Sequence, residues 1–159
     1  MDTLWAPWRI EYILQPKDDG CIFCEKPKQH NDLANLIPYR GQTCYVIMNY
    51  YPYNNGHIMV VPYRHTCDLT SLSHEENLEM MSLVSKSIQV ISKALNPHGF
   101  NIGMNLGSVA GAGVKDHLHF HVVPRWNGDI NFMPVVGHTK VISEALEVTC
   151  KKLKQYFES

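Results

Sequence analysis

Residues 117–123 read His-Leu-His-Phe-His-Val-Val, three histidines alternating with apolar side chains. Successive side chains of a β-strand point to opposite faces, so this pattern predicts a strand over 117–123, ended by Pro124. The three imidazoles would share one face, about 6–7 Å apart along the strand, while Leu118, Phe120 and Val122 would pack on a hydrophobic core. One face of the strand would therefore belong to the core, and the other would present a cluster of titratable groups.

The clustered imidazoles suit two kinds of chemistry. At neutral pH a histidine is largely uncharged and keeps one unprotonated ring nitrogen, which can attack an electrophile or bind a metal ion. Two other interpretations stay open on these residues alone. The histidines could form the solvent-facing side of an edge strand, or they could be the ligands of a three-histidine metal site.

Two further strands flank a turn in the first half of the chain. Residues 43–49 (TCYVIMN) and 57–63 (HIMVVPY) are rich in β-branched and aromatic side chains. The segment 50–56 between them contains the Pro, Asn and Gly residues that favour turns. The pattern predicts an antiparallel hairpin, and a similar apolar segment predicts another strand over 100–106.

Residues 74–95 have the pattern of an amphipathic helix. Ser73 and Glu76 match a capping box at its start, and residues 96–99 (NPHG) end it. The residues expected on its apolar stripe are Leu78, Met81, Val84, Ile88, Ile91 and Leu95. A C-terminal helix is expected from the spacing of Ile142, Leu146, Leu153 and Phe157. Hairpins and two helices, without obvious parallel crossovers, indicate an α+β domain.

Size and composition limit the class of protein. The 159 residues and 45% hydrophobic content fit a single domain, 1–159, with an irregular N-terminal segment over 1–32. A formal net charge of −1 argues against a wide basic surface for long nucleic acid. No apolar run suits a membrane span and the N-terminus lacks a signal-peptide pattern, so a cytoplasmic protein is expected. Five cysteines, an odd number, favour metal binding or burial over a disulfide framework.

The histidine pattern resembles the signature of the histidine triad (HIT) superfamily. Residues 49–62, the glycine-rich loop 107–113 and Pro124-Arg125-Trp126 also resemble HIT segments in the expected order. Within the superfamily, the chain is similar to the branch of fragile histidine triad protein and the bacterial diadenosine tetraphosphate phosphorylases. The segments that carry this second likeness are 5–9, 99–107, 110–113, 127–134 and 139–141. The resemblance covers most of the chain and implies an antiparallel sheet of about five strands with two main helices.

The resemblance implies roles for four histidines. His119, the middle one of the triad, would attack the α-phosphorus of a nucleotide and form a covalent nucleotidyl-imidazole. His121 would hydrogen-bond near the phosphate, and His117 would orient its neighbours and fix the tautomer of His119 through its carbonyl. His57, on the adjacent strand, matches a further active-site histidine of many members, although a partly buried strand histidine is an equally ordinary interpretation.

The resemblance also implies nucleotide contacts. Asn49 matches the residue that holds the ribose, whose hydroxyl groups suit an amide oxygen. Asn105 matches an amide that contacts phosphate, and Gly111 and Gly113 would let backbone N–H groups approach phosphate oxygens. Many members have a polar side chain just before the triad, whereas this chain has Gly-Ala-Gly-Val at 111–114, as the phosphorylase branch does. The handling of the leaving group therefore does not transfer from the commoner hydrolases.

A metal site is expected in the N-terminal segment. Cys21 and Cys24 have the C-x-x-C spacing that lets two thiolates bind one ion from a tight turn, although a redox pair or two unrelated cysteines would read the same. In several bacterial HIT proteins such a pair binds zinc with two histidines, which correspond here to His65 and His117. The resemblance thus implies a structural zinc site with two cysteines and two histidines. The remaining cysteines, expected to be partly buried thiols, are Cys44, Cys67 and Cys150.

The expected activity is nucleotidyl transfer from a dinucleoside polyphosphate such as diadenosine tetraphosphate, by phosphorolysis or hydrolysis. The Ala-Gly-Ala-Gly and Asn-Phe-Met-Pro segments favour phosphorolysis, through the same resemblance. The alternatives are a purine nucleoside phosphoramidase or another HIT hydrolase, a nucleotide-binding module with vestigial catalysis, and a metal-dependent hydrolase that uses the triad as ligands. A homodimer is also expected, because HIT proteins usually form one.

Overall fold

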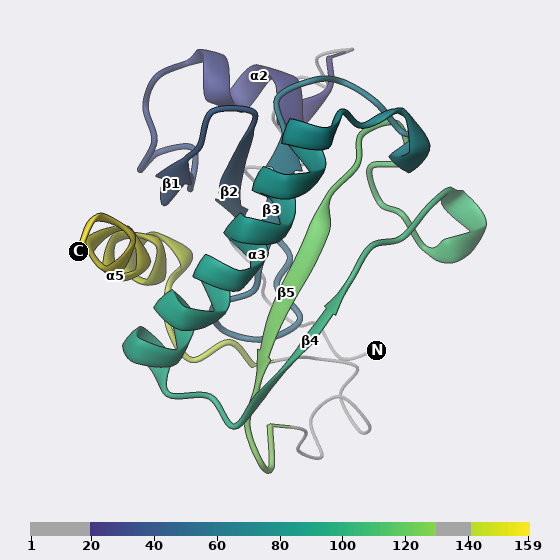
Figure 1. Ribbon diagram of the computed structural model, residues 1–159. Coiled ribbons are helices and arrows are strands. Elements are labelled where there is room, and N and C mark those ends of the chain that lie inside the picture. The colour runs from purple at the N-terminus through teal and green to yellow at the C-terminus, as the bar shows by residue number, and fades with distance from the viewer. Residues whose placement is uncertain (1–19, 130–140) are drawn as a thin grey trace, which may run out of the picture.

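The computed structural model describes residues 20–129 and 141–159 and places a five-stranded sheet at the centre of the protein (Figure 1). The strands are β1 (Tyr39–Arg40), β2 (Cys44–Met48), β3 (Ile58–Pro62), β4 (Gly99–Gly103) and β5 (Phe120–Arg125). The helices are α2 (Ile22–Lys28), α3 (His74–Leu95) and α5 (Leu146–Glu158), with 3₁₀ turns η1 (Leu69–Ser71) and η2 (Ser108–Ala110). The segment 5–9 and most of the segments 127–134 and 139–141 lie outside the described residues.

All neighbouring strands are antiparallel, in the order β1-β2-β3-β5-β4. The hairpin of β2 and β3 pairs Cys44 with Pro62 and Met48 with Ile58, which confirms the predicted hairpin. In the centre of the sheet, Met59 of β3 lies opposite His121 of β5. The expected antiparallel sheet of about five strands and α+β class are thus confirmed.

The sheet has a separate apolar cluster on each face. On one face, α3 packs on β2, β3 and β5, and α5 packs beside it (Figure 1). Leu118, Phe120 and Val122 belong to this side, as their alternation predicts. On the other face, Phe23 of α2 packs on a second cluster from the strands and loops, formed with Ile37, Tyr45, Ile47, Met59 and Val61. The triad histidines lie on this α2 side.

Helix α3 has the predicted limits, but its buried stripe matches the predicted one only in part. Ser73 Oγ accepts from Glu76 N–H while the Glu76 carboxylate accepts from Ser73 N–H, which confirms the capping box, and Asn96 ends the helix in a left-handed conformation. Leu78 and Met81 are 61% and 51% exposed. Val84 and Ile91 are buried as predicted, and Ile88 and Leu95 are partly buried against the same core. The other apolar and small residues that the helix buries are Met80, Leu83, Ser87 and Val90.

The limits of β4 and β5 also differ from the prediction. Strand β5 begins at Phe120, because Leu118 N–H donates to the carbonyl of Thr66 in the loop after β3 and so leaves the ladder. It continues through Pro124, because β3 pairs with β5 only as far as Val122 and the missing N–H of proline is not needed beyond that point. Strand β4 ends at Gly103, opposite His121, instead of reaching 106.

Two other expectations are corrected, and one strand had not been expected. The N-terminal segment is not irregular throughout, since α2 forms within it although Pro27 lies inside the helix and no side chain caps its start. Strand β1, only two residues long, was not predicted. Cys67 is exposed, whereas Cys44 and Cys150 are fully buried and burial raises the pKa of both thiols to about 11. No helix within the described ranges is long and apolar enough to cross a membrane.

Candidate active site and metal centre

Three histidines meet on the α2 side of the sheet. His57 directly precedes β3, His119 directly precedes β5, and His121 is the second residue of β5. The ring centroids of His119 and His121 are 4.9 Å apart, and those of His57 and His121 are 5.1 Å apart. His57 is fully buried and His119 is 4% exposed. His117 and His119 of the triad are buried, and β5 lies between β3 and β4, so the interpretation as the solvent-facing side of an edge strand is wrong.

One hydrogen bond sets the tautomer of His119. Its Nδ1 lies 2.9 Å from the backbone carbonyl of His117, and a carbonyl only accepts, so Nδ1 bears the proton. Burial lowers the pKa of His119, partly opposed by this hydrogen bond, so the ring is neutral at neutral pH. Its Nε2 then bears a lone pair and has no hydrogen-bond partner among residues 20–129 and 141–159. This is the arrangement that a nitrogen nucleophile requires.

A relay of hydrogen bonds sets the tautomer of His121. Tyr53 N–H donates to His57 Nδ1 over 3.0 Å, so the proton of neutral His57 lies on Nε2. That Nε2–H donates to His121 Nδ1 over 2.9 Å, which leaves the proton of neutral His121 on its own Nε2. Burial, with a smaller contribution from neighbouring histidines, lowers the pKa of His57 to about 3 and that of His121 to about 4. His121 therefore offers an N–H donor beside the lone pair of His119.

The buried neutral state of His57 gives the protein a pH-dependent stability. An unfolded histidine has a pKa of about 6.5. Between that value and the folded pKa of about 3, only the unfolded chain takes up the proton. The stabilising contribution is therefore complete above the unfolded pKa and is lost as the pH falls toward the folded one. When the pH is lowered from about 7 to 5, we expect His57 to reduce the free energy of unfolding by about 2 kcal/mol.

Urea unfolding at these two pH values measures the effect. The glutamine of His57→Gln keeps a hydrogen-bonding side chain but does not titrate, so the variant should lose about 2 kcal/mol less than the wild type over the same interval. Equal losses in the two proteins would show that His57 is not the group responsible.

Four potential metal ligands converge at the start of α2. The ligand atoms of Cys21, Cys24, His65 and His117 all lie within 4.8 Å of one another. His117 Nδ1 is 3.3 Å and 3.6 Å from the two sulfurs, and His65 Nδ1 is 3.4 Å from that of Cys24. A tetrahedral ion with ordinary Zn–S and Zn–N bonds separates such atoms by about 3.5 Å. The cluster could hold a metal ion, and its composition matches the predicted set of two cysteines and two histidines.

His117 joins the two sites. Its Nε2–H donates to the carbonyl of Pro62 over 2.8 Å, which leaves a lone pair on Nδ1, the nitrogen that faces Cys21 and Cys24. Such a hydrogen bond to the far nitrogen is what orients a metal-binding histidine. The ring of His117 is thus directed at the metal cluster, while its carbonyl holds His119.

The predicted nucleotide contacts are only partly brought together. Asn49 lies beside the histidines, with its Nδ2 3.4 Å from His57 Nε2 and its Oδ1 accepting from Tyr51 N–H. Asn105 instead contacts its own loop, where its Nδ2 donates to the carbonyl of Gly111 over 3.5 Å. Gly111 has a φ of +89° that favours glycine. Gly113 has no such φ, and a Cβ there would meet nothing within 4 Å.

Two residues beside the histidines were not predicted. Phe23 packs against both His117 and His119, at centroid distances of 5.5 Å and 5.0 Å. The Tyr53 ring lies 4.8 Å from that of His57. Phe23 stands between the two cysteines of the C-x-x-C motif, so the motif itself was the available signal. Tyr53 acts on His57 through its backbone, which no side-chain pattern reveals.

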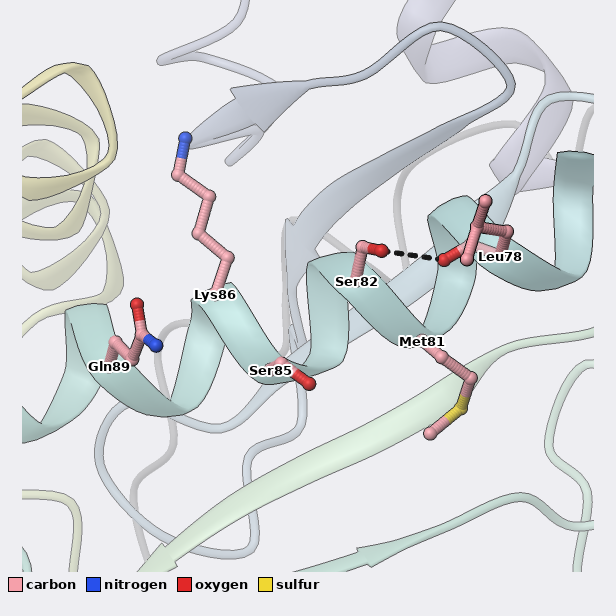
Figure 2. Close-up of a pocket in the computed structure, with 6 residues that line it drawn as sticks. All are labelled: Leu78, Met81, Ser82, Ser85, Lys86 and Gln89. Carbon is pink, nitrogen blue, oxygen red and sulfur yellow. Dashed lines mark hydrogen bonds between the residues drawn. The ribbon is translucent and has the colours of Figure 1, made fainter.

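A surface pocket elsewhere on the protein is not part of this site. Figure 2 shows its lining, which comes entirely from α3 and consists of Leu78, Met81, Ser82, Ser85, Lys86 and Gln89. Ser82 Oγ donates to the carbonyl of Leu78 within it. Helix α3 covers the face of the sheet opposite α2, and the pocket contains neither a histidine nor a cysteine. The histidine cluster is therefore the better candidate for the functional site.

Comparisons with known proteins agree with this geometry. A family model described as the HIT domain matches residues 32–128. The AP-4-A phosphorylase of Mycobacterium tuberculosis is 42% identical over 162 residues, covering 96% of this chain and 83% of that protein. An adenosine 5'-monophosphoramidase of Schizosaccharomyces pombe is 31% identical over 108 residues, covering 68% of this chain and 76% of its own.

Solved structures show the same fold. A Zn-bound histidine triad family protein from Mycobacterium smegmatis superposes with a TM-score of 0.69 at 26% identity, covering 87% of this chain and 94% of its own. The family match, the curated relatives and the convergence of the triad with His57 lead to one conclusion, which is that this chain belongs to the HIT domain family.

Proposed function

We propose that the protein cleaves dinucleoside polyphosphates, diadenosine tetraphosphate in particular, by phosphorolysis through a nucleotidyl-His119 intermediate. The single observation that carries this is the tautomer of His119, whose Nδ1–H is held by the His117 carbonyl so that Nε2 presents a lone pair. The similarity to the AP-4-A phosphorylase supports the choice of substrate and of phosphate as the acceptor.

The reaction consists of two displacements. In the first, the lone pair of His119 Nε2 attacks the α-phosphorus, and the bond from that phosphorus to the bridging oxygen breaks. ATP leaves, and the AMP moiety stays covalently bound to the His119 ring. In the second, an oxygen of orthophosphate attacks the same phosphorus, the P–N bond breaks, and ADP leaves with His119 restored. Two steps through a covalent intermediate replace one more difficult step.

The remaining site residues would stabilise charge and hold the nucleotide. His121 Nε2–H would donate to a non-bridging phosphate oxygen, with its tautomer set by His57. His117 would orient His119, and Asn49 would contact the ribose. Asn105, Gly111 and Gly113 would contact the polyphosphate from their loop, a placement that requires Asn105 to exchange its weak contact with Gly111 for substrate.

Product analysis with labelled orthophosphate tests the proposal. Incubation with diadenosine tetraphosphate and ³²P-orthophosphate should give ADP and ATP, with the label in ADP alone and no products when phosphate is omitted. AMP and ATP formed without phosphate would instead establish a hydrolase. Hydrolysis of adenosine 5'-phosphoramidate, with no turnover of the tetraphosphate, would favour the phosphoramidase alternative.

We further propose that Cys21, Cys24, His65 and His117 bind a structural zinc ion. Two thiolates and two imidazoles are a ligand set typical of such sites, and the M. smegmatis relative of the same fold is described as Zn-bound. The ion would join α2, the loop after β3 and the segment before β5, which are far apart in the sequence. Four protein ligands leave no open coordination position, so the ion would not bind substrate or take part in the chemical step.

We also propose that the protein is a cytoplasmic homodimer. None of the five cysteines forms a disulfide, which suits a reducing compartment. Strand β4 lies at an edge of the sheet, and Ile102 on it is 44% exposed, so an unpaired strand edge with an exposed apolar side chain is available to a second copy. Light scattering at micromolar concentration should give the mass of two chains, and the mass of one chain would contradict the dimer.

A further inference from the structure

Phe23 fills the space between the metal cluster and the proposed nucleophile. Its ring meets that of His117 edge-on, at an interplanar angle of 77°, and that of His119 at a tilt of 49°. The side chain is 3% exposed. One aromatic ring therefore contacts both the histidine that faces the metal cluster and the histidine that would attack phosphorus.

The position of Phe23 depends on how α2 is held. This helix has only seven residues, and no side chain caps its start, so it is too short to be stable alone. Cys21 and Cys24 stand on either side of Phe23 in the chain, and both sulfurs face His117. The hydroxyl of Tyr45 donates to the carbonyl of Phe23 over 2.7 Å and ties the same turn to the sheet.

The contacts form a closed loop through the two sites. The two sulfurs face the ring of His117, and the carbonyl of His117 accepts from His119 Nδ1. The ring of His119 packs on Phe23. Phe23 lies in the same turn as the two cysteines, where Cys24 N–H donates to the carbonyl of Cys21. The metal cluster therefore reaches the His119 ring by two routes, through the backbone of His117 and through the side chain of Phe23.

We propose that Phe23 is a positioning residue, through which a metal ion bound by the C-x-x-C turn sets the orientation of His119 and so the rate of nucleotidyl transfer. The metal would thus act on catalysis without contacting substrate, in addition to stabilising the fold. This inference rests on the proposed function of His119. The reacting atoms must be aligned for attack, and a displacement of about 1 Å can cost about 100-fold in rate.

Substitutions at Phe23 test the inference in the metal-loaded protein. Leucine keeps apolar volume but loses the flat ring, so Phe23→Leu should lower kcat about tenfold and Phe23→Ala about 100-fold, with KM changed less than about threefold. Both variants should keep the wild-type zinc content. The control is Ile37→Ala, which truncates a buried residue of the same cluster with no ring contact to His119 and should leave kcat unchanged at a similar loss of stability.

A spectroscopic readout separates positioning from general damage. In the loaded wild type, ¹⁵N NMR of the His119 ring should show the Nδ1–H tautomer alone. In Phe23→Ala, and in wild type stripped of zinc by a chelator, the ring should show a mixture of tautomers or broadened signals while AMP still binds. If Phe23→Ala does not fold, the same ¹⁵N measurement on Phe23→Leu takes its place.

Two results would overturn the inference. One is a folded, zinc-loaded Phe23→Leu variant with wild-type kcat, and the other is a zinc-stripped, folded wild type with wild-type kcat and an unchanged His119 signal. Failure of the proposed function looks different, because a His119→Gly variant would then retain turnover. The two failures can therefore be told apart.

Discussion

Replacement of His119 by glycine is expected to lower kcat for diadenosine tetraphosphate by about 10⁴-fold or more, since loss of a covalent nucleophile removes the chemical route itself. Neither of the other two triad histidines can substitute. His117 directs Nδ1 to the cysteines and Nε2 to Pro62, and His121 is left with a protonated Nε2 by its hydrogen bond from His57. Steady-state kinetics with phosphate present, and the absence of an acid-labile nucleotidyl-protein, measure the loss.

A matched rescue shows whether the rest of the site survives in His119→Gly. Adenosine 5'-phosphorimidazolide already contains the P–N bond that the variant cannot make, and its imidazole would occupy the space of the deleted ring. With orthophosphate the variant should convert it to ADP and free imidazole. Turnover of the tetraphosphate by the variant at a wild-type rate would exclude His119 as the nucleophile.

The features that the sequence predicted correctly are those encoded by local periodicity. The alternation in 117–123 places the histidines and the apolar residues on opposite sides even though β5 begins only at Phe120, because the chain stays extended before the ladder starts. The capping box at Ser73 fixed the start of α3 for the same reason, since donor and acceptor lie three residues apart.

The features that were missed depend on contacts between distant segments. Helix α2 is held by Tyr45 and by the cysteines facing His117, none of which is visible in its own seven residues. The end of β4 is set by where β5 leaves the ladder. Likewise, Phe23 acquires a neighbour in His119 only once α2 packs on the sheet, so a motif search recovers the cysteines on either side of it and passes over the ring.

Cys24→Ala is expected to lower the zinc content from about one ion per chain to nearly none and to destabilise the fold strongly. The four ligands come from three segments joined by long stretches of chain, so the ion acts as a cross-link in the folded state alone. Loss of about 3–5 kcal/mol of such binding energy would lower Tm by about 10 °C in a domain of this size. Metal analysis and thermal unfolding, on protein purified without chelator, give both values.

Cys67→Ala is the matched control, because it makes the same chemical change at an exposed thiol outside the cluster and should alter neither zinc content nor Tm. Acidification offers an independent check, since every ligand must lose its proton to bind and burial beside Cys21 already raises the pKa of the Cys24 thiol. Zinc should therefore be released as the pH falls, with Tm falling in parallel. Wild-type protein containing well under one zinc ion per chain, or a Cys24→Ala variant that keeps its zinc, would contradict the site. A Cys24→Ala variant with no zinc and a lowered Tm but a wild-type kcat would restrict the metal to a structural role. The orientation of His119 would then depend on the hydrogen bond that its Nδ1–H donates to the carbonyl of His117.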